Sequence, residues 1–262
     1  VSKADGGQFD GNVTMAGTLA TTGNATFSGD IIKSTSGTSN FAAGVNAGNS
    51  IASGGNYNTV VGDEAGTALT TGDHNTAIGY AALDAEDAGT ASVAIGNYAL
   101  SSQNADGNNY NTAVGYVAGS NVTTGTQNTL IGGLSGDSIT DADGNVAVGY
   151  ATLTDNVLGS NSVAIGRNAL NAQNPASATD MYNVAVGNNA GEAITTGVSN
   201  NIIGGLAGDA LTVGSYNQVM GVVALSADTQ GSRAVAIGHG ALMTQNFTSA
   251  NDNYNIAIGH NA

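Results

Sequence analysis

The residues with the clearest chemical potential are three histidines and a few closely spaced carboxylates. The histidines are His74, His239 and His260, and the chain contains no cysteine. A zinc site takes about four ligands, drawn mainly from Cys and His, so the sequence does not predict one. His239 and His260 each follow a glycine in the same repeated phrase, so we interpret them as two copies of one repeat position.

Two acidic stretches are the remaining candidates for a metal site. Asp141 and Asp143, in the string DADGN, have the carboxylate spacing that begins a calcium-binding loop, but the distant glutamate that completes such a loop is missing. We therefore favour a solvated turn and keep calcium as a weak alternative. Asp84, Glu86 and Asp87 form a second acidic corner, which we interpret in the same way.

No arrangement typical of an enzyme is recognisable. A nucleophile elbow is missing, and the glycine-rich strings are not followed by the helix that a nucleotide-binding turn requires. Turns of a repetitive β-structure account for these strings better. The sequence therefore predicts neither an enzyme nor a cofactor.

One short phrase, such as NTAIGYAAL at residues 75–83, recurs to the end of the chain every 17 to 21 residues. Counted from its glycine as position 0, positions −1 and −2 are apolar in every copy, and position −4 is Asn in ten. A fixed short period indicates a repeat architecture, and strands of about five residues with turns at Gly and Asn fit this one. We predict an all-β solenoid of about 13 coils over residues 40–262. The anchor glycines are Gly44, Gly62, Gly79, Gly96, Gly115, Gly132, Gly149, Gly166, Gly187, Gly204, Gly221, Gly238 and Gly259.

Equivalent residues of successive repeats form a column, and the residue types in each column predict whether it faces the core or solvent and which contacts it makes. Position −1, which includes Ile165, is expected to face the core, and the variable position +1, which includes Asn188, is expected to face solvent. The Asn column at −4 is expected to form coil-to-coil hydrogen bonds between stacked amides. Position +4 alternates as two Gly then two Leu, and an aliphatic residue stands at +7 only where +4 is Gly. We infer that both positions fill the same inner space.

Every fourth repeat carries an insertion at the same place, in residues 104–110, 174–182 and 246–254. Insertions in a solenoid map to loops on one face, which is often the binding face. Each insertion ends in a tyrosine, and all nine tyrosines either directly precede position −4 or stand one or two residues after an anchor glycine. We interpret them first as packing across coils or between subunits with the hydroxyl in water, and an aromatic surface for sugar rings or another receptor group is the alternative. For Tyr110, Tyr182 and Tyr254, which end the insertions, both interpretations stay open. The receptor-binding candidates are Asn104, Asp106, Tyr110, Asn174, Asp180, Tyr182, Asn246, Asp252 and Tyr254.

Residues 1–39 have a different glycine spacing, since Gly11, Gly17, Gly23 and Gly29 are six residues apart. The intervening Val, Thr, Leu, Phe and Ile favour short strands, so we predict a slender β-structured stalk. A disordered linker is the alternative. Because the chain begins at Val1 and stops just inside a repeat, we expect it to be a piece of a longer protein.

Composition restricts the partners. The net charge of −15 disfavours binding to nucleic acid and to anionic membranes, and no apolar run approaches the 18 residues of a membrane span. Only 5% of the residues are aromatic, so one coil encloses a thin core. Association of three chains would bury a second apolar face, and we therefore expect a homotrimer.

The phrase Asn161–Gly166 (NSVAIG) resembles the head repeat of YadA-like trimeric autotransporter adhesins. The longer forms NTAIGYAAL and NTAVGYVAG, with a following TTG, are even more similar to phage tail-fibre proteins. The resemblance implies a left-handed parallel β-roll, a parallel homotrimer, and a fibre segment in the virion that presents a surface to a host receptor, for which a glycan is one candidate. The period is longer than that of the autotransporter head. A bacterial surface adhesin head is the main alternative, and an ice-binding solenoid and a depolymerase tailspike are weaker ones.

Overall fold

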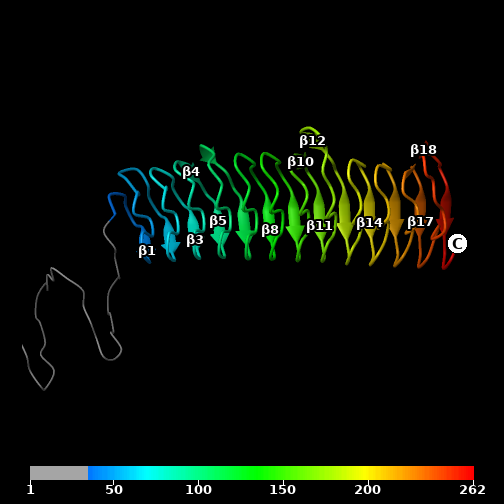
Figure 1. The fold of residues 1–262 in the computed structure, drawn as a ribbon, viewed down its shortest axis with the longest axis horizontal. Helices are drawn as coiled ribbons and strands as arrows, with labels where there is room; N and C mark the ends of the chain where they lie inside the picture. The colour runs from blue at the N-terminus through cyan, green and yellow to red at the C-terminus, as the bar shows by residue number, and fades with distance from the viewer. Residues whose placement is uncertain (1–34) are drawn as a thin grey trace, which may run out of the picture. The chain divides into compact units, whose positions relative to one another are not determined.

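The computed structural model describes residues 35–262, so nearly all of the predicted stalk (residues 1–39) lies outside the described residues. These residues wind into a parallel β-solenoid of thirteen turns with no helix, which confirms the predicted fold class (Figure 1). Within the described part of the chain, no helix is long and apolar enough to cross a membrane.

Each turn contributes one three-residue strand to a single parallel sheet, and strands follow one another in chain order. The register repeats the sequence period, because Ala77 pairs with Val60 on one side and with Ala94 on the other. The strands are β1 (Phe41–Ala43), β2 (Thr59–Val61), β3 (Thr76–Ile78), β5 (Val93–Ile95), β7 (Thr112–Val114), β8 (Thr129–Ile131), β9 (Val146–Val148), β11 (Val163–Ile165), β13 (Val184–Val186), β14 (Asn201–Ile203), β15 (Gln218–Met220), β17 (Val235–Ile237) and β19 (Ile256–Ile258).

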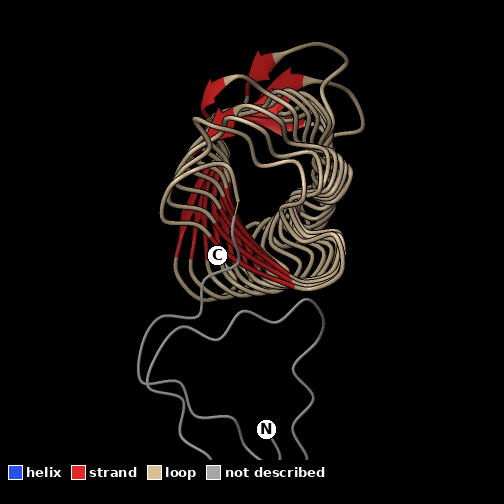
Figure 2. Ribbon diagram, turned by 90° about the vertical axis from the view of Figure 1, so that its left-hand side faces the viewer, coloured by secondary structure: helices blue, strands red, loops and turns tan. Residues whose placement is uncertain are grey.

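Three additional two-stranded sheets lie at another corner of the coil, where the insertions occur. They pair β4 (Gly89–Thr90) with β6 (Gly107–Asn108), β10 (Gly159–Ser160) with β12 (Thr179–Asp180), and β16 (Gly231–Ser232) with β18 (Asn251–Asp252). Viewed along the solenoid axis, the insert loops project at the top of the cross-section beyond the wall that the other coils share (Figure 2).

The anchor glycine closes each strand at a point where neighbouring coils touch. Gly115 has φ +145, and a Cβ on it would lie 2.5 Å from the carbonyl oxygen of Gly132 in the next coil. Only glycine tolerates both this backbone conformation and this contact. The strict recurrence of the glycine therefore follows from stacking.

The inward-facing residue of each strand is position −2, not −1. Ala164 is fully buried, whereas its neighbour Ile165 is 38% exposed. The prediction that position −1 faces the core is therefore wrong. Successive side chains of a strand point to opposite faces, and because both columns are apolar, the pattern alone did not show which one points inward.

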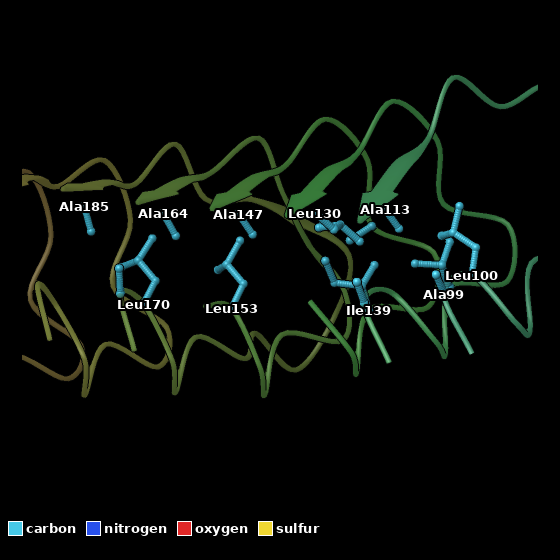
Figure 3. Packing of buried hydrophobic residues seen from close by; sticks show 14 of the residues in the cluster. Ala99, Leu100, Ala113, Leu130, Ile139, Ala147, Leu153, Ala164, Leu170 and Ala185 are labelled. Atoms are coloured by element: carbon cyan, nitrogen blue, oxygen red, sulfur yellow. The ribbon is translucent and has the colours of Figure 1, made fainter. Parts of the chain in front are cut away.

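Position −2 is mostly alanine because large side chains reach it from the opposite wall. Figure 3 shows Ala147 and Ala164 on their strands pointing toward Leu153 and Leu170. These leucines stand at position +4 with φ near +50°, a left-handed conformation that costs a branched residue about 1 kcal/mol. Complete burial of the leucine side chain offsets this cost.

The inferred exchange between positions +4 and +7 agrees with the structure. Leucines from +4 and aliphatic residues from +7 belong to one buried cluster. Where +4 is glycine, a side chain there would crowd the aliphatic residue at +7, since a Cβ on Gly48 would lie 2.8 Å from Cδ1 of Ile51. Each coil thus supplies its large aliphatic group from one of two positions.

The asparagines at position −4 tie each coil to the next, as predicted, but their main partner is the backbone. Asn58 accepts a hydrogen bond at Oδ1 from the N–H of Asn75 (2.8 Å), and its Nδ2 donates to the carbonyl oxygen of Gly72 (2.8 Å). Direct amide-to-amide bonds in this column are recorded from Asn200 to Asn183 (3.2 Å) and from Asn217 to Asn200 (3.1 Å). The backbone pattern recurs at Asn40, Asn75, Asn111, Asn128, Asn145, Asn183, Asn200 and Asn217.

Candidate binding edge at the insert loops

All three insert loops place their predicted binding residues at the surface. The tyrosines that end them, Tyr110, Tyr182 and Tyr254, are 55%, 56% and 65% exposed. The other six candidates are exposed as well: Asn104, Asp106, Asn174, Asp180, Asn246 and Asp252.

Within the second and third loops, the structure brings an aspartate and the terminal tyrosine together. The Tyr182 hydroxyl donates to Asp180 Oδ2 (3.1 Å), and the Tyr254 hydroxyl donates to Asp252 Oδ2 (3.4 Å). The bond to Asp180 raises the pKa of the Tyr182 hydroxyl. The loops themselves are not brought together, because four coils separate each from the next, a distance of roughly 19 Å along the axis.

The loop tyrosines belong to a longer exposed column, which we call the edge column. It consists of position −5 of every repeat, and all of its residues have φ between +51° and +67°. His74 and Arg233 also belong to it, because both stand at the same distance from an anchor glycine as the tyrosines do, although their residue types alone do not indicate this surface. The members are Ser39, Tyr57, His74, Ala91, Tyr110, Gln127, Gly144, Asn161, Tyr182, Ser199, Tyr216, Arg233 and Tyr254.

Neighbouring members of the edge column stack on one another along the solenoid. The rings of Tyr57 and His74 are parallel, with centroids 5.0 Å apart. The guanidinium carbon of Arg233 lies 4.7 Å from the ring centroid of Tyr216 and 5.9 Å from that of Tyr254. Arg233 also forms an ion pair with Asp252 (Nε to Oδ1, 3.0 Å). At these two places the side chains of the edge column therefore stack, ring on ring or guanidinium on ring.

The other four tyrosines follow the sheet strands instead of preceding them. Tyr80, Tyr116 and Tyr150 stand at position +1 and Tyr98 at +2, and all four are exposed. Tyr80 and Tyr98 meet edge to face, with centroids 5.2 Å apart. The tyrosines thus lie in two separate groups, one in the edge column and one directly after the sheet strands.

A buried polar network lies directly beneath the first insert loop. Glu86 is fully buried and accepts hydrogen bonds from Gly89 N (2.7 Å), Gln103 Nε2 (2.8 Å) and Asn109 Nδ2 (3.0 Å). Gln103 Oε1 in turn accepts from Asn111 Nδ2 (2.8 Å). The interpretation of Glu86 as part of a solvated turn is therefore wrong, because its side chain points inward to anchor the loop.

The third insert loop has the same kind of anchor. Asp228 is fully buried and accepts from Gln245 Nε2 (2.6 Å), Gly231 N (2.9 Å) and Phe247 N (3.1 Å), the last of which lies in the loop itself. A carboxylate under each of these two loops thus takes the place of the aliphatic side chain found at +7 in other coils. The signal in the sequence was the polar residue at +7 in the coil that precedes the one with each insertion.

The second loop is built without a charge. Asn156 replaces the buried carboxylate and bonds with Gly159, and Met181 stands where the first loop has Asn109. Both are fully buried. The chain therefore contains an uncharged version of its own loop anchor.

The predicted weak calcium candidates serve as acceptors for the preceding coil. Asp141 Oδ1 accepts from the hydroxyls of Thr123 (3.1 Å) and Thr124 (2.9 Å), and Asp143 Oδ1 accepts from the backbone N–H of Thr126 (2.6 Å). Among residues 35–262, no group of three or more His, Cys, Asp and Glu side chains is placed to hold a metal ion.

The hydroxyls of several repeated threonines also form hydrogen bonds within the solenoid. Thr195 and Thr212 donate to the backbone carbonyls of Thr212 and Thr229 in the following coils, at 3.3 and 2.7 Å. This use of the hydroxyls does not favour the ice-binding alternative, which requires them to face water in a regular array.

No protein family, curated protein or solved structure matches this chain.

Proposed function

We propose that this chain is a structural segment of a phage tail fibre: a parallel homotrimeric, left-handed β-roll that spaces and presents a host receptor-binding surface. The observation that carries the proposal is the uncharged, largely apolar outer face of the thirteen-stranded sheet. The similarity of the repeated phrase to tail-fibre repeats supports the same class of protein.

The outer face of the sheet is formed by positions −1 and −3. Position −1 is apolar in all thirteen strands, and several of its members are more than a third exposed in the single chain, including Ile165 at 38% and Met220 at 50%. None of the thirteen strands contains a charged residue, although the chain has 19 acidic residues and a net charge of −15. Position −3 is apolar in seven strands and Thr, Asn or Gln in the other six. A large uncharged and mainly apolar face of this kind marks an interaction surface.

Further copies of the same chain are the best occupants of this face. Its side chains repeat at the strand spacing of about 4.8 Å over about 60 Å, and only a surface with the same repeat can match that spacing throughout. A second copy provides this repeat, and the lack of charge lets two acidic chains approach each other. Closed three-fold association would bury the sheet face of every chain.

The insert loops are suited to the presenting role. They project from a different corner than the sheet, so association through the sheet leaves them accessible (Figure 2). Two of the three are held by buried carboxylates, which fix the loops on a rigid scaffold. Binding residues commonly occupy such loops.

The first test is the mass in solution. We expect size-exclusion chromatography with light scattering to give three times the 25.5 kDa of the chain. A stable monomer would overturn the proposed assembly. Host attachment is tested separately, with the loop-shortened variant described in the Discussion.

A further inference from the structure

The edge column contains a gap that is filled in one block of coils and open in another. In the third block, Arg233 occupies the position between Tyr216 and Tyr254, with its guanidinium over both rings. In the first block the corresponding three residues are His74, Ala91 and Tyr110. An aromatic ring thus precedes and follows the position in both blocks, but the first block has only a methyl group between them.

The two positions are equivalent in backbone conformation and in their place in the repeat, although Asp252, which pairs with Arg233, has the uncharged Asn108 as its counterpart in the first block. Ala91 has φ +61° and Arg233 has φ +64°. Each directly follows a small strand that pairs with its insert loop, since Thr90 pairs with Asn108 and Ser232 pairs with Asp252. The rings of His74 and Tyr110 are two coils apart, roughly 9.6 Å, the same coil separation that Arg233 bridges in the third block.

We propose that the gap over Ala91, between His74 and Tyr110, binds the guanidinium group of an arginine that a protein partner supplies. Arg233 is the internal example of this contact. A planar guanidinium stacks on aromatic faces, whereas an ammonium ion is compact and strongly hydrated, so the slot favours arginine over lysine. The inference does not rest on the proposed trimer or on host attachment, because one chain forms the whole slot.

Charge supports a basic occupant. The chain carries a net charge of −15, and Asp73 precedes His74 while Asp106 stands exposed on the adjoining loop. The second block does not form the slot, because Gly144 replaces the first ring. There Asn161 turns to Asp180 through a hydrogen bond of 2.8 Å.

The same order of residues recurs once more in the edge column, where Tyr182 and Tyr216 precede and follow the small residue Ser199. A second slot of the same kind is therefore expected over Ser199.

The probe is a fluorescent tri-arginine peptide, with a tri-lysine peptide of equal charge as its control, titrated in low salt and followed by anisotropy. We expect the arginine peptide to bind about threefold or more tightly than the lysine peptide, in keeping with a cation–π contact. Equal affinity for the two peptides would overturn the proposal, since it would show attraction by net charge alone.

Variants matched in charge locate the site. All of these variants are made in a Ser199→Arg background, which fills the similar gap between Tyr182 and Tyr216. In that background Ala91→Arg should fill the slot over Ala91 from within and remove the preference for arginine, whereas Asn161→Arg adds the same charge at the corresponding position of the second block and should keep it. Tyr110→Ala should also lose the preference, and Tyr150→Ala, in the other tyrosine column, should not. Retention of the preference in Ala91→Arg would overturn the assignment.

Opening the filled position gives an independent test. Arg233→Ala leaves a gap between Tyr216 and Tyr254, so it should add one arginine-selective site per chain. An unchanged number of sites would contradict the idea that this geometry selects guanidinium. Binding of a neutral oligosaccharide such as maltohexaose that is lost in Ala91→Arg, with no preference between the two peptides, would assign the slot to a sugar instead and overturn the proposal.

Discussion

Gln103 donates a hydrogen bond of 2.8 Å from Nε2 to Oε2 of Glu86, one coil earlier, and both side chains are fully buried. Burial raises the pKa of Glu86, and the hydrogen bonds from Gln103 and from the backbones of Gly89 and Ala105 offset this only in part. Proton binding by one carboxyl group is therefore coupled to the packing beneath the first insert loop.

The first prediction concerns the pH dependence of stability. Because the folded pKa of Glu86 lies above the ordinary value of 4.5, its favourable contribution is fully present below pH 4.5 and is lost as the pH rises through the folded pKa. Glu86→Gln should remove this part of the pH dependence. The measurement is the free energy of unfolding by denaturant, taken for both proteins between pH 4 and pH 7. The difference in unfolding free energy between the parent and Glu86→Gln should change with pH, and a constant difference would refute the coupling.

The uncharged second anchor gives the reverse experiment. Asn156→Asp places a carboxylate where Met181 provides no hydrogen bond, so we expect a loss of about 1–3 kcal/mol in the free energy of unfolding at pH 7. The loss should diminish as the pH is lowered. If Asn156→Asp is as stable as the parent at neutral pH, Met181 is not the feature that separates this anchor from the charged ones.

The second prediction concerns the asparagine column. Asn128→Ala removes the acceptor of the Asn145 N–H and the donor to the Ala142 carbonyl, and leaves both buried backbone groups unpaired. We expect a cost of about 2–4 kcal/mol in unfolding free energy. The control is Asn188→Asp at the exposed position +1, which should change stability by less than about 0.5 kcal/mol.

The third prediction separates the two faces of the sheet. Ala164→Asp buries a carboxylate in the core and should prevent folding of the coil, because an unpaired buried charge costs several kcal/mol. Ile165→Asp should leave the β-structure intact but place a charge on the outer face, so the association between chains should be lost. Circular dichroism and light scattering on the two variants give the answer. A folded Ile165→Asp protein with the parent mass would exclude this face as the interface.

The sequence predicted the coil, its period and the exposed loops because these depend on features that repeat. The thirteen glycines in register show where neighbouring coils touch. An interruption of the 17-residue period shows where a loop projects from the solenoid. The facing of Ile165 did not follow, since Ala164 and Ile165 are both apolar and only their volumes differ. The burial of Glu86 was missed because a carboxylate in an acidic stretch is ordinarily solvated. Glu86 is buried instead because Gln103 and Asn109, which lie in a later coil, donate hydrogen bonds to its carboxylate.

The edge column shows a third kind of limit. Tyrosines were recognised by type, whereas His74 and Arg233 joined them only when residues were compared by position in the repeat. Their stacking depends on the strand spacing and on a left-handed backbone at position −5, which follows from the geometry of the coil and not from local sequence preference.

The last prediction is that the insert loops carry host binding and contribute little to the fold. Deleting residues 106–107, 176–179 and 248–251 restores the 17-residue spacing while leaving the buried anchor residues in place. The deleted residues are almost all exposed. We therefore expect the circular dichroism spectrum, the melting temperature and the mass in solution to stay close to those of the parent.

The same variant should lose attachment to cells. The probe is a bacterial strain to which the fluorescently labelled parent protein binds in flow cytometry, and the control is a protein of full length whose loop tips are replaced by Gly and Ser. Both altered proteins should bind much more weakly than the parent, because three loops on each of three chains would otherwise add their weak contacts through avidity. If the shortened protein binds as well as the parent, the binding surface lies elsewhere than at the deleted loop tips.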